Sequence, residues 1–102
     1  MPTTDDPVRV AFRVHGSVQG VGYRRFAARE AQALDLVGWV RNEEDGSVCG
    51  EVEGPGAALL IFQARLKAGP PFARVDRLDW ERLDWGPLDV RSSLPPSFQI
   101  RR

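Results

Sequence analysis

Apolar and polar residues alternate near the start of the chain and then change to a helical spacing. Between Val8 and Val14 every second residue is a valine or a phenylalanine, which is the pattern of a β-strand with one buried face. From Tyr23 to Leu34 the apolar residues form one stripe at helical spacing, which leaves Arg25 on the solvated side. We expect a strand over residues 8–14 and a helix over residues 23–34.

A hairpin is predicted next. An extended apolar run covers residues 37–40, and residues 44–47 read Glu-Asp-Gly-Ser, a typical hairpin turn in which Gly46 can take a positive φ. Residues 48–53 then alternate Val, Gly and Val with Cys and Glu. This alternation indicates a strand with Cys49 on its outer face.

The second half of the chain repeats the order helix then strand. Pro55 is well placed to begin a helix, and Gly69 followed by two prolines is a typical helix end. Residues 73–80 are predicted to form a strand. Its apolar residues Val75 and Leu78 are three positions apart instead of two, so we expect a β-bulge near Asp76 and Arg77. A short last strand is predicted over residues 97–101.

The predicted order is strand, helix, strand, strand, helix, strand, with one additional terminal strand. This order is typical of the ferredoxin-like split βαβ fold of the α+β class. We expect a mostly antiparallel sheet with both helices packed on one face. One domain covers residues 8–102 and follows a flexible tail, residues 1–7. The proline-bearing stretch 86–96 fits no element of this order.

Composition narrows the class of protein. A chain of 102 residues with 42% apolar residues is long enough for one globular domain. Fourteen basic and fourteen acidic residues give no net charge, hence no general attraction to nucleic acid or to an anionic membrane. Cys49 is the only cysteine, so no intrachain disulfide is possible. The polar residues 1–7 lack the apolar core of a signal peptide. We expect a cytoplasmic monomer with no nucleic-acid or membrane partner.

The candidate chemistry lies between the first strand and the first helix. A glycine-rich loop can turn backbone N–H groups toward a ligand, and the helix start adds unpaired N–H groups and a positive dipole end. Arg24, in the first helical turn, adds a planar fork suited to phosphate oxygens. A glycine-rich turn beside a surface arginine is the alternative. The candidate loop residues are Gly16, Ser17, Val18, Gln19, Gly20, Val21, Gly22 and Tyr23.

A second segment, residues 38–54, reads Gly-Trp-Val-Arg-Asn-Glu-Glu-Asp-Gly-Ser-Val-Cys-Gly-Glu-Val-Glu-Gly. Together with the glycine-rich loop, it resembles the motifs of the acylphosphatases, small enzymes that hydrolyse carboxyl-phosphate anhydrides. Tyr23 departs from the family, which more often has Phe or Met there, so we expect its ring in the core with the hydroxyl near the surface. The first motif is matched by Gly16, Val18, Gln19, Gly20, Val21 and Arg24. The second motif is matched by Gly38, Trp39, Val40, Asn42, Gly46, Val48 and Gly54.

The resemblance implies the ferredoxin-like fold, with the additional strand at a sheet edge, and small acyl phosphates as substrates. By the same resemblance, Arg24 binds the phosphoryl group and Asn42 orients the attacking water. The amide of Asn42 offers both a donor and an acceptor for that task. Neither a cofactor nor a metal is expected. As alternatives, Arg24 pairs with a surface carboxylate, and Asn42 caps the turn that begins at Glu43.

Two neighbouring polar residues also have competing interpretations. His15, the only histidine, adjoins the loop and would be a candidate base, but we favour an exposed or capping role. Gln19 either contacts the ligand or braces the loop, and we favour the brace. Cys49 is expected to be an idle thiol.

Two other functions are compatible with the same element order. One is a phosphate-binding or acyl-phosphate-binding module without turnover. The other is an RNA-binding domain, which would display aromatic residues on its central strands. Because Phe12 shares the apolar face of its strand, we expect it to be buried, which argues against RNA binding.

Overall fold

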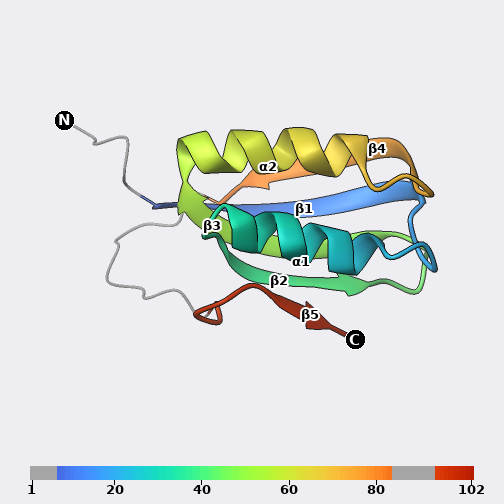
Figure 1. Ribbon diagram of the computed structural model, residues 1–102, viewed down its shortest axis with the longest axis horizontal. Coiled ribbons are helices and arrows are strands. Elements are labelled where there is room, and N and C mark those ends of the chain that lie inside the picture. Colours follow the sequence, from blue (N-terminus) through green and yellow to red (C-terminus); the bar gives the residue numbers. More distant parts are fainter. Residues whose placement is uncertain (1–6, 84–93) are drawn as a thin grey trace.

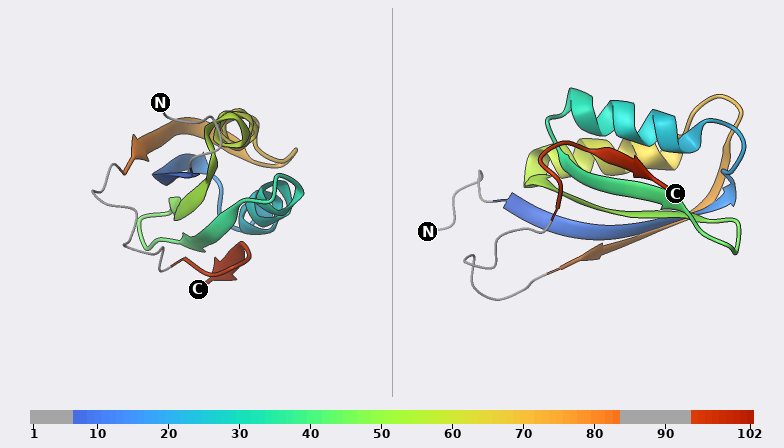
Figure 2. Two further views of the ribbon diagram at one scale, coloured as in Figure 1. Left: turned by 90° about the vertical axis from the view of Figure 1, so that its left-hand side faces the viewer. Right: turned by 90° about the horizontal axis from the view of Figure 1, so that it is seen from below.

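Two helices cover one face of a five-stranded sheet in the computed structural model, which describes residues 7–83 and 94–102 (Figure 1). The sheet order is β4-β1-β3-β2-β5. The end-on view in Figure 2 shows both helices on the same side of the sheet. The elements are β1 (Pro7–Ser17), α1 (Tyr23–Ala33), β2 (Val37–Asn42), β3 (Val48–Pro55), α2 (Gly56–Ala68), β4 (Arg74–Arg82) and β5 (Gln99–Arg101).

The sheet is antiparallel except at one edge. β1 pairs antiparallel with β3 and β4, and β2 pairs antiparallel with β3, whereas β5 pairs parallel with β2 at the sheet edge. The predicted ferredoxin-like class is therefore confirmed, including the helices on one face and the last strand at an edge. Of the expected tail, Pro7 belongs to β1, and residues 1–6 lie outside the described residues. Most of the stretch 86–96 lies outside them as well.

The pairing of β1 with β4 contains a β-bulge at the end near the glycine loop. His15 pairs with Arg77 and Gly16 pairs with Val75, so Asp76 is the additional residue. The bulge is where the apolar spacing predicted it. Gly16 has φ +136°, and a Cβ there would overlap the carbonyl oxygen of Arg74. Glycine at this position allows the close approach of the two backbones.

The core lies between the helices and the inner face of the sheet. Phe62 of α2 forms its centre, with ring centroids 5.9 Å from Phe12 and 6.0 Å from Phe98. Phe98 is buried just before β5, and its carbonyl oxygen accepts a hydrogen bond from Gln32 of α1 at 3.2 Å. These contacts anchor the C-terminal strand β5 beside α1 and β2, the elements that carry Arg24 and Asn42.

Helix ends follow the sequence signals. Pro55, in an extended conformation, immediately precedes α2, and Gly69 ends it with φ +69°. Within the described residues, no helix is long and apolar enough to span a membrane.

Candidate active site

A pocket opens at the end of the sheet where α1 begins and β2 ends. It has a volume of about 410 Å³. The β1–α1 loop, the first turn of α1, the end of β2 and the end of β5 meet at the right-hand end of the molecule in Figure 1. The lining residues are Val18, Gly20, Gly22, Tyr23, Arg24, Arg25, Asn42 and Ile100. The two motifs therefore share one site, because Arg24 and Asn42 line the same pocket.

Two glycines shape the start of α1. Gly20 has φ +77° and Gly22 has φ +79°, and a Cβ at either position would meet no atom within 4 Å. Glycine is favoured here by the left-handed backbone, not by lack of space. Gly22 immediately precedes the helix, and no side chain of the described residues caps this end. The N–H groups of the first turn therefore lack a capping side chain at the pocket.

Arg24 is held from the far end of the chain. Its Nη1 donates a hydrogen bond to the backbone carbonyl oxygen of Arg101 in β5, at 3.0 Å. Among the described residues, no carboxylate lies within ion-pair distance of this guanidinium. The surface ion-pair alternative therefore finds no support, and most of the five donors of the guanidinium remain available to a ligand.

Asn42 is the last residue of β2 and is half-buried. Within the described part of the chain, its side-chain amide makes no hydrogen bond. Other groups hold the following turn: the Glu43 amide donates to the Ser47 carbonyl at 2.8 Å, and the Ser47 amide donates to Asp45 Oδ1 at 2.9 Å. The capping alternative for Asn42 therefore lacks support, and its amide is open to the pocket.

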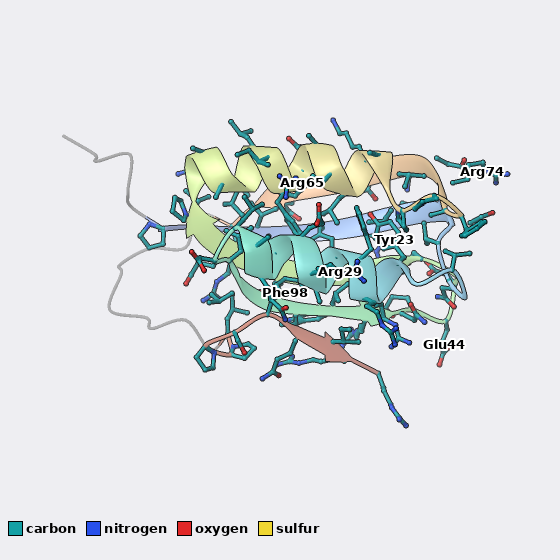
Figure 3. The ribbon with its side chains drawn as sticks, in the orientation of Figure 1. Tyr23, Arg29, Glu44, Arg65, Arg74 and Phe98 are labelled. Atoms are coloured by element: carbon teal, nitrogen blue, oxygen red, sulfur yellow. The ribbon has the colours of Figure 1, made fainter. Side chains whose placement is uncertain are left out.

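Gln19 fastens the glycine loop to the β2–β3 turn. Its amide nitrogen donates to the carbonyl oxygens of Glu43 at 2.7 Å and Ser47 at 2.9 Å. These bonds fit the brace that the sequence favoured, and they keep the loop beside Asn42. Figure 3 shows Glu44, in the turn, at the same end of the molecule as the start of α1.

The remaining loop residues divide between pocket and sheet. Val18 is buried and forms part of the pocket wall, together with Gly20, Gly22 and Tyr23. Gly16 and Ser17 belong to β1, where Gly16 meets β4, and neither lines the pocket. Gln19 and Val21 are also outside the lining.

Tyr23 corrects one expectation. The ring packs in the core, but its hydroxyl is also buried and donates to the carbonyl oxygen of Leu66 at 2.7 Å. Leu66 lies in the last turn of α2, where helix carbonyls lack an intrahelical partner. The hydroxyl of Tyr23, a residue labelled in Figure 3, satisfies one of these carbonyls across the helix pair. Burial raises the pKa of Tyr23 well above its ordinary value.

His15 lies apart from the pocket. Its Nε2 is 2.9 Å from Asp79 Oδ2 and 3.1 Å from Arg77 Nη2. The hydrogen bond to His15 lowers the pKa of Asp79. This histidine is half-exposed, does not line the pocket, and belongs to a β1–β4 charge cluster, so the base interpretation finds no support.

Cys49 lies on the helix-free face of the sheet, beside Trp39 and Glu51, as its alternation predicted. Its Sγ contacts Glu43 Oε1 at 2.8 Å, and burial raises the pKa of the thiol. A raised pKa disfavours the reactive thiolate. Among residues 7–83 and 94–102, no His, Cys, Asp and Glu side chains form a group that could hold a metal ion.

Two lining residues were not predicted. Ile100, from β5, is 47% exposed although it is apolar. Arg25 was expected only to be solvated, and it is exposed as well as lining the pocket. The position of Arg25 directly after Arg24 could have predicted that it lies near the pocket. Ile100, in contrast, reaches the pocket through the parallel pairing of β5 with β2.

Comparison with known proteins agrees with this geometry. The family model described as Acylphosphatase matches residues 10–88. The chain belongs to the acylphosphatase family. It is 51% identical over 94 residues to an acylphosphatase of Salinibacter ruber, covering 92% of this chain and 93% of that protein. Members of this family are acid-anhydride hydrolases that act on small acyl phosphates. As a member of the family, this chain is an acid-anhydride hydrolase.

Solved acylphosphatase structures have the same fold. The acylphosphatase of Bacillus subtilis superposes with a TM-score of 0.81 at 35% identity, covering 93% of this chain and 99% of that chain. An acylphosphatase from Coxiella burnetii gives a TM-score of 0.80 at 30% identity, with 93% of both chains covered.

Proposed function

We propose that the chain hydrolyses acyl phosphates in the pocket at the start of α1, with Arg24 and Asn42 as its catalytic residues. The observation that carries the proposal is that both side chains line one pocket and keep polar groups available there. Arg24 comes from a helix and Asn42 from a strand end. Only the folded chain brings them together.

The phosphoryl group is bound by Arg24 and by backbone N–H groups of the loop and the first turn of α1. The left-handed conformations at Gly20 and Gly22 and the uncapped helix start support this role. Donors fixed in advance stabilise charge without reorganisation, and phosphoryl transfer depends mainly on such positioning and charge stabilisation.

Asn42 orients the attacking water. Its amide can accept one hydrogen bond from the water and donate another to a phosphoryl oxygen. The leaving group is a carboxylate, whose conjugate acid has a pKa of roughly 4, so it needs no general acid. The proton of the water passes to the phosphate oxygens. The reaction therefore forms one P–O bond to water and breaks the P–O bond to the carboxylate.

Ile100 lies against the acyl group of the substrate. It is the half-exposed apolar side chain of the pocket and comes from the edge strand β5. An acyl group that extends past Ile100 would cover apolar surface that is otherwise in contact with water.

Hydrolysis of benzoyl phosphate, followed by ultraviolet absorbance, tests these roles. We expect turnover by the wild type, weakened phosphate binding and lost turnover in Arg24→Ala, and retained phosphate binding with slow turnover in Asn42→Ala. Arg29→Ala is the matched control, because this exposed arginine of α1 does not line the pocket. Full activity in Arg24→Ala, or in Asn42→Ala, would contradict the assigned role of that residue.

The same experiment separates the alternatives. A folded wild type that binds phosphate without turnover would be a phosphate-binding module. RNA binding has little to support it, because Phe12 is only 3% exposed and its ring contacts Phe62.

We also propose that the protein acts as a cytoplasmic monomer. Arg24 and Asn42 meet within one copy of the chain, so the proposed site does not need a second copy. The one cysteine cannot form an intrachain disulfide, which suits a reducing compartment. Light scattering coupled to size-exclusion chromatography measures the oligomeric state, and fractionation of the source cells measures the location. A stable dimer, or recovery from an extracytoplasmic fraction, would contradict this proposal.

A further inference from the structure

A second arginine, Arg25, stands at the mouth of the pocket. It lines the pocket beside Arg24, and its side chain is exposed. Within residues 7–83 and 94–102, it has neither a hydrogen-bond partner nor a carboxylate within ion-pair distance. An unpaired guanidinium at the rim of a site for an anionic ligand is available to the ligand.

Several arginines outside the pocket are paired with carboxylates. Six of them lie within 3.6 Å of a carboxylate oxygen, and the described pocket lining contains no Asp or Glu. The pocket therefore carries two positive side chains in addition to the positive end of the α1 dipole. The paired arginines and their partners are Arg9–Glu53, Arg13–Asp45, Arg41–Glu43, Arg65–Glu30, Arg74–Asp76 and Arg77–Asp79.

Helix geometry places the two pocket arginines on different sides. Successive residues of an α-helix are rotated by about 100°. Tyr23 points into the core and Arg24 reaches β5. Arg25, about 200° around the axis from Tyr23, therefore points away from the core, over the outer rim. A group that extends out of the pocket would pass within reach of this side chain.

We propose that Arg25 is a specificity-determining residue that favours acyl phosphates whose acyl group carries a second anionic group, such as a carboxylate or a phosphate. The inference rests on the proposed function, because the phosphoryl group must occupy Arg24 and the helix start. The acyl group then extends toward the mouth, where the guanidinium fork of Arg25 pairs with the distal anion. The pair is exposed to solvent, so its effect is modest and sensitive to salt.

The test compares five aromatic substrates: benzoyl phosphate, two ring derivatives with a carboxylate and two with an uncharged carboxamide. Both derivatives are made with the substituent at the meta and at the para position, because neither position allows the group to attack its own anhydride. The readout is kcat/KM for the carboxylate divided by kcat/KM for the carboxamide. Each variant thereby serves as its own reference for overall activity.

The variants are Arg25→Gln and, as the matched control, Arg29→Gln. Arg29 lies one turn further along the same helix, is exposed, and is not part of the pocket lining (Figure 3). It carries the same charge on nearly the same side of α1, so it reports the effect of general helix charge. Circular dichroism confirms that both variants fold.

For at least one ring position, we expect the carboxylate-to-carboxamide ratio to fall about two- to fivefold in Arg25→Gln. In Arg29→Gln the ratio should stay near that of the wild type. The wild-type ratio should decrease with added salt, because exposed pairs are screened. An unchanged ratio at both ring positions in Arg25→Gln, with benzoyl phosphate still hydrolysed, would overturn the inference. If the wild type does not hydrolyse benzoyl phosphate, the proposed function itself fails.

Discussion

Nη1 of Arg24 and the backbone carbonyl oxygen of Arg101 are 3.0 Å apart and connect the first turn of α1 to the C-terminal strand. The acceptor is a backbone atom, so the bond does not depend on the side chain of Arg101. It consumes one donor of the guanidinium and fixes the direction of the others. The position of β5 therefore contributes directly to the geometry of the anion site.

Arg24→Lys should separate charge from geometry. Lysine keeps the positive charge but is a point donor that cannot hold the β5 carbonyl and two phosphoryl oxygens as a planar fork does. We expect kcat/KM for benzoyl phosphate to fall by a factor of about 100 or more, the usual effect of losing a preorganised donor at developing charge. Steady-state kinetics beside Arg29→Lys measure the effect. A loss below threefold would mean that charge alone is sufficient.

Gly16 and Gly20 should respond differently to alanine. A Cβ at Gly16 collides with the backbone of β4, whereas at Gly20 it meets no atom within 4 Å. Gly20→Ala therefore costs only the left-handed backbone, about 1 kcal/mol. Gly16→Ala should cost considerably more, because the bulge itself must move. Urea unfolding of both variants measures the difference, and equal costs would contradict the structural role of Gly16.

The sequence was sufficient to predict the elements and much of the site. The alternation of apolar residues within a strand shows which side chains share a face. This alternation is strict in β1 and interrupted in β4, so the bulge at Asp76 was predictable. Partners across the fold were not predictable in this way. A three-residue parallel pairing brings Ile100 to the pocket and the carbonyl of Arg101 to Arg24, and such a short strand carries little periodic signal.

The hydroxyl of Tyr23 was also beyond the sequence pattern. Periodicity placed its ring in the core, but the free carbonyl of Leu66 comes from the end of another helix. A pattern within α1 cannot indicate which carbonyl of α2 lacks a partner. Tyr23 departs from the motif but keeps an aromatic ring, which predicted a ring in the core and left the partner of its hydroxyl undetermined.

Tyr23→Phe should destabilise the protein and change its response to alkali. Losing the bond to Leu66 leaves a buried carbonyl unsatisfied, at a cost of about 1–3 kcal/mol. The folded pKa of Tyr23 lies above its unfolded value of about 10. This stabilisation is fully present below pH ~10 and is lost as the pH rises toward the folded pKa. Thermal unfolding from pH 7 to 11 should show a steeper alkaline decline in the wild type than in the variant. Parallel declines would contradict the burial of the hydroxyl.

Ile100→Ala should weaken binding of the aromatic acyl group. The side chain is half-exposed in the free protein and should be covered by substrate. Losing part of this apolar contact should raise KM for benzoyl phosphate about three- to tenfold, with a smaller effect on kcat. Ile61→Ala is the matched control, because Ile61 is 45% exposed on α2 and does not line the pocket. The same KM in wild type and Ile100→Ala would place the acyl group elsewhere.

His15→Gln tests whether the nearby histidine takes part in catalysis. His15 faces Asp79 and Arg77, not the pocket, so kcat/KM should stay within twofold of the wild type, with an unchanged pH profile between pH 5 and 8.

The His15→Gln substitution should change the stability of the protein instead. The pKa of Asp79 is held below its ordinary value, so this interaction stabilises the fold above pH ~4 and its contribution is lost as the pH falls through the lowered pKa. The difference in Tm between wild type and variant should therefore be present at pH 5 and shrink in stronger acid. A large loss of kcat/KM in His15→Gln at neutral pH would instead make His15 a participant in the reaction.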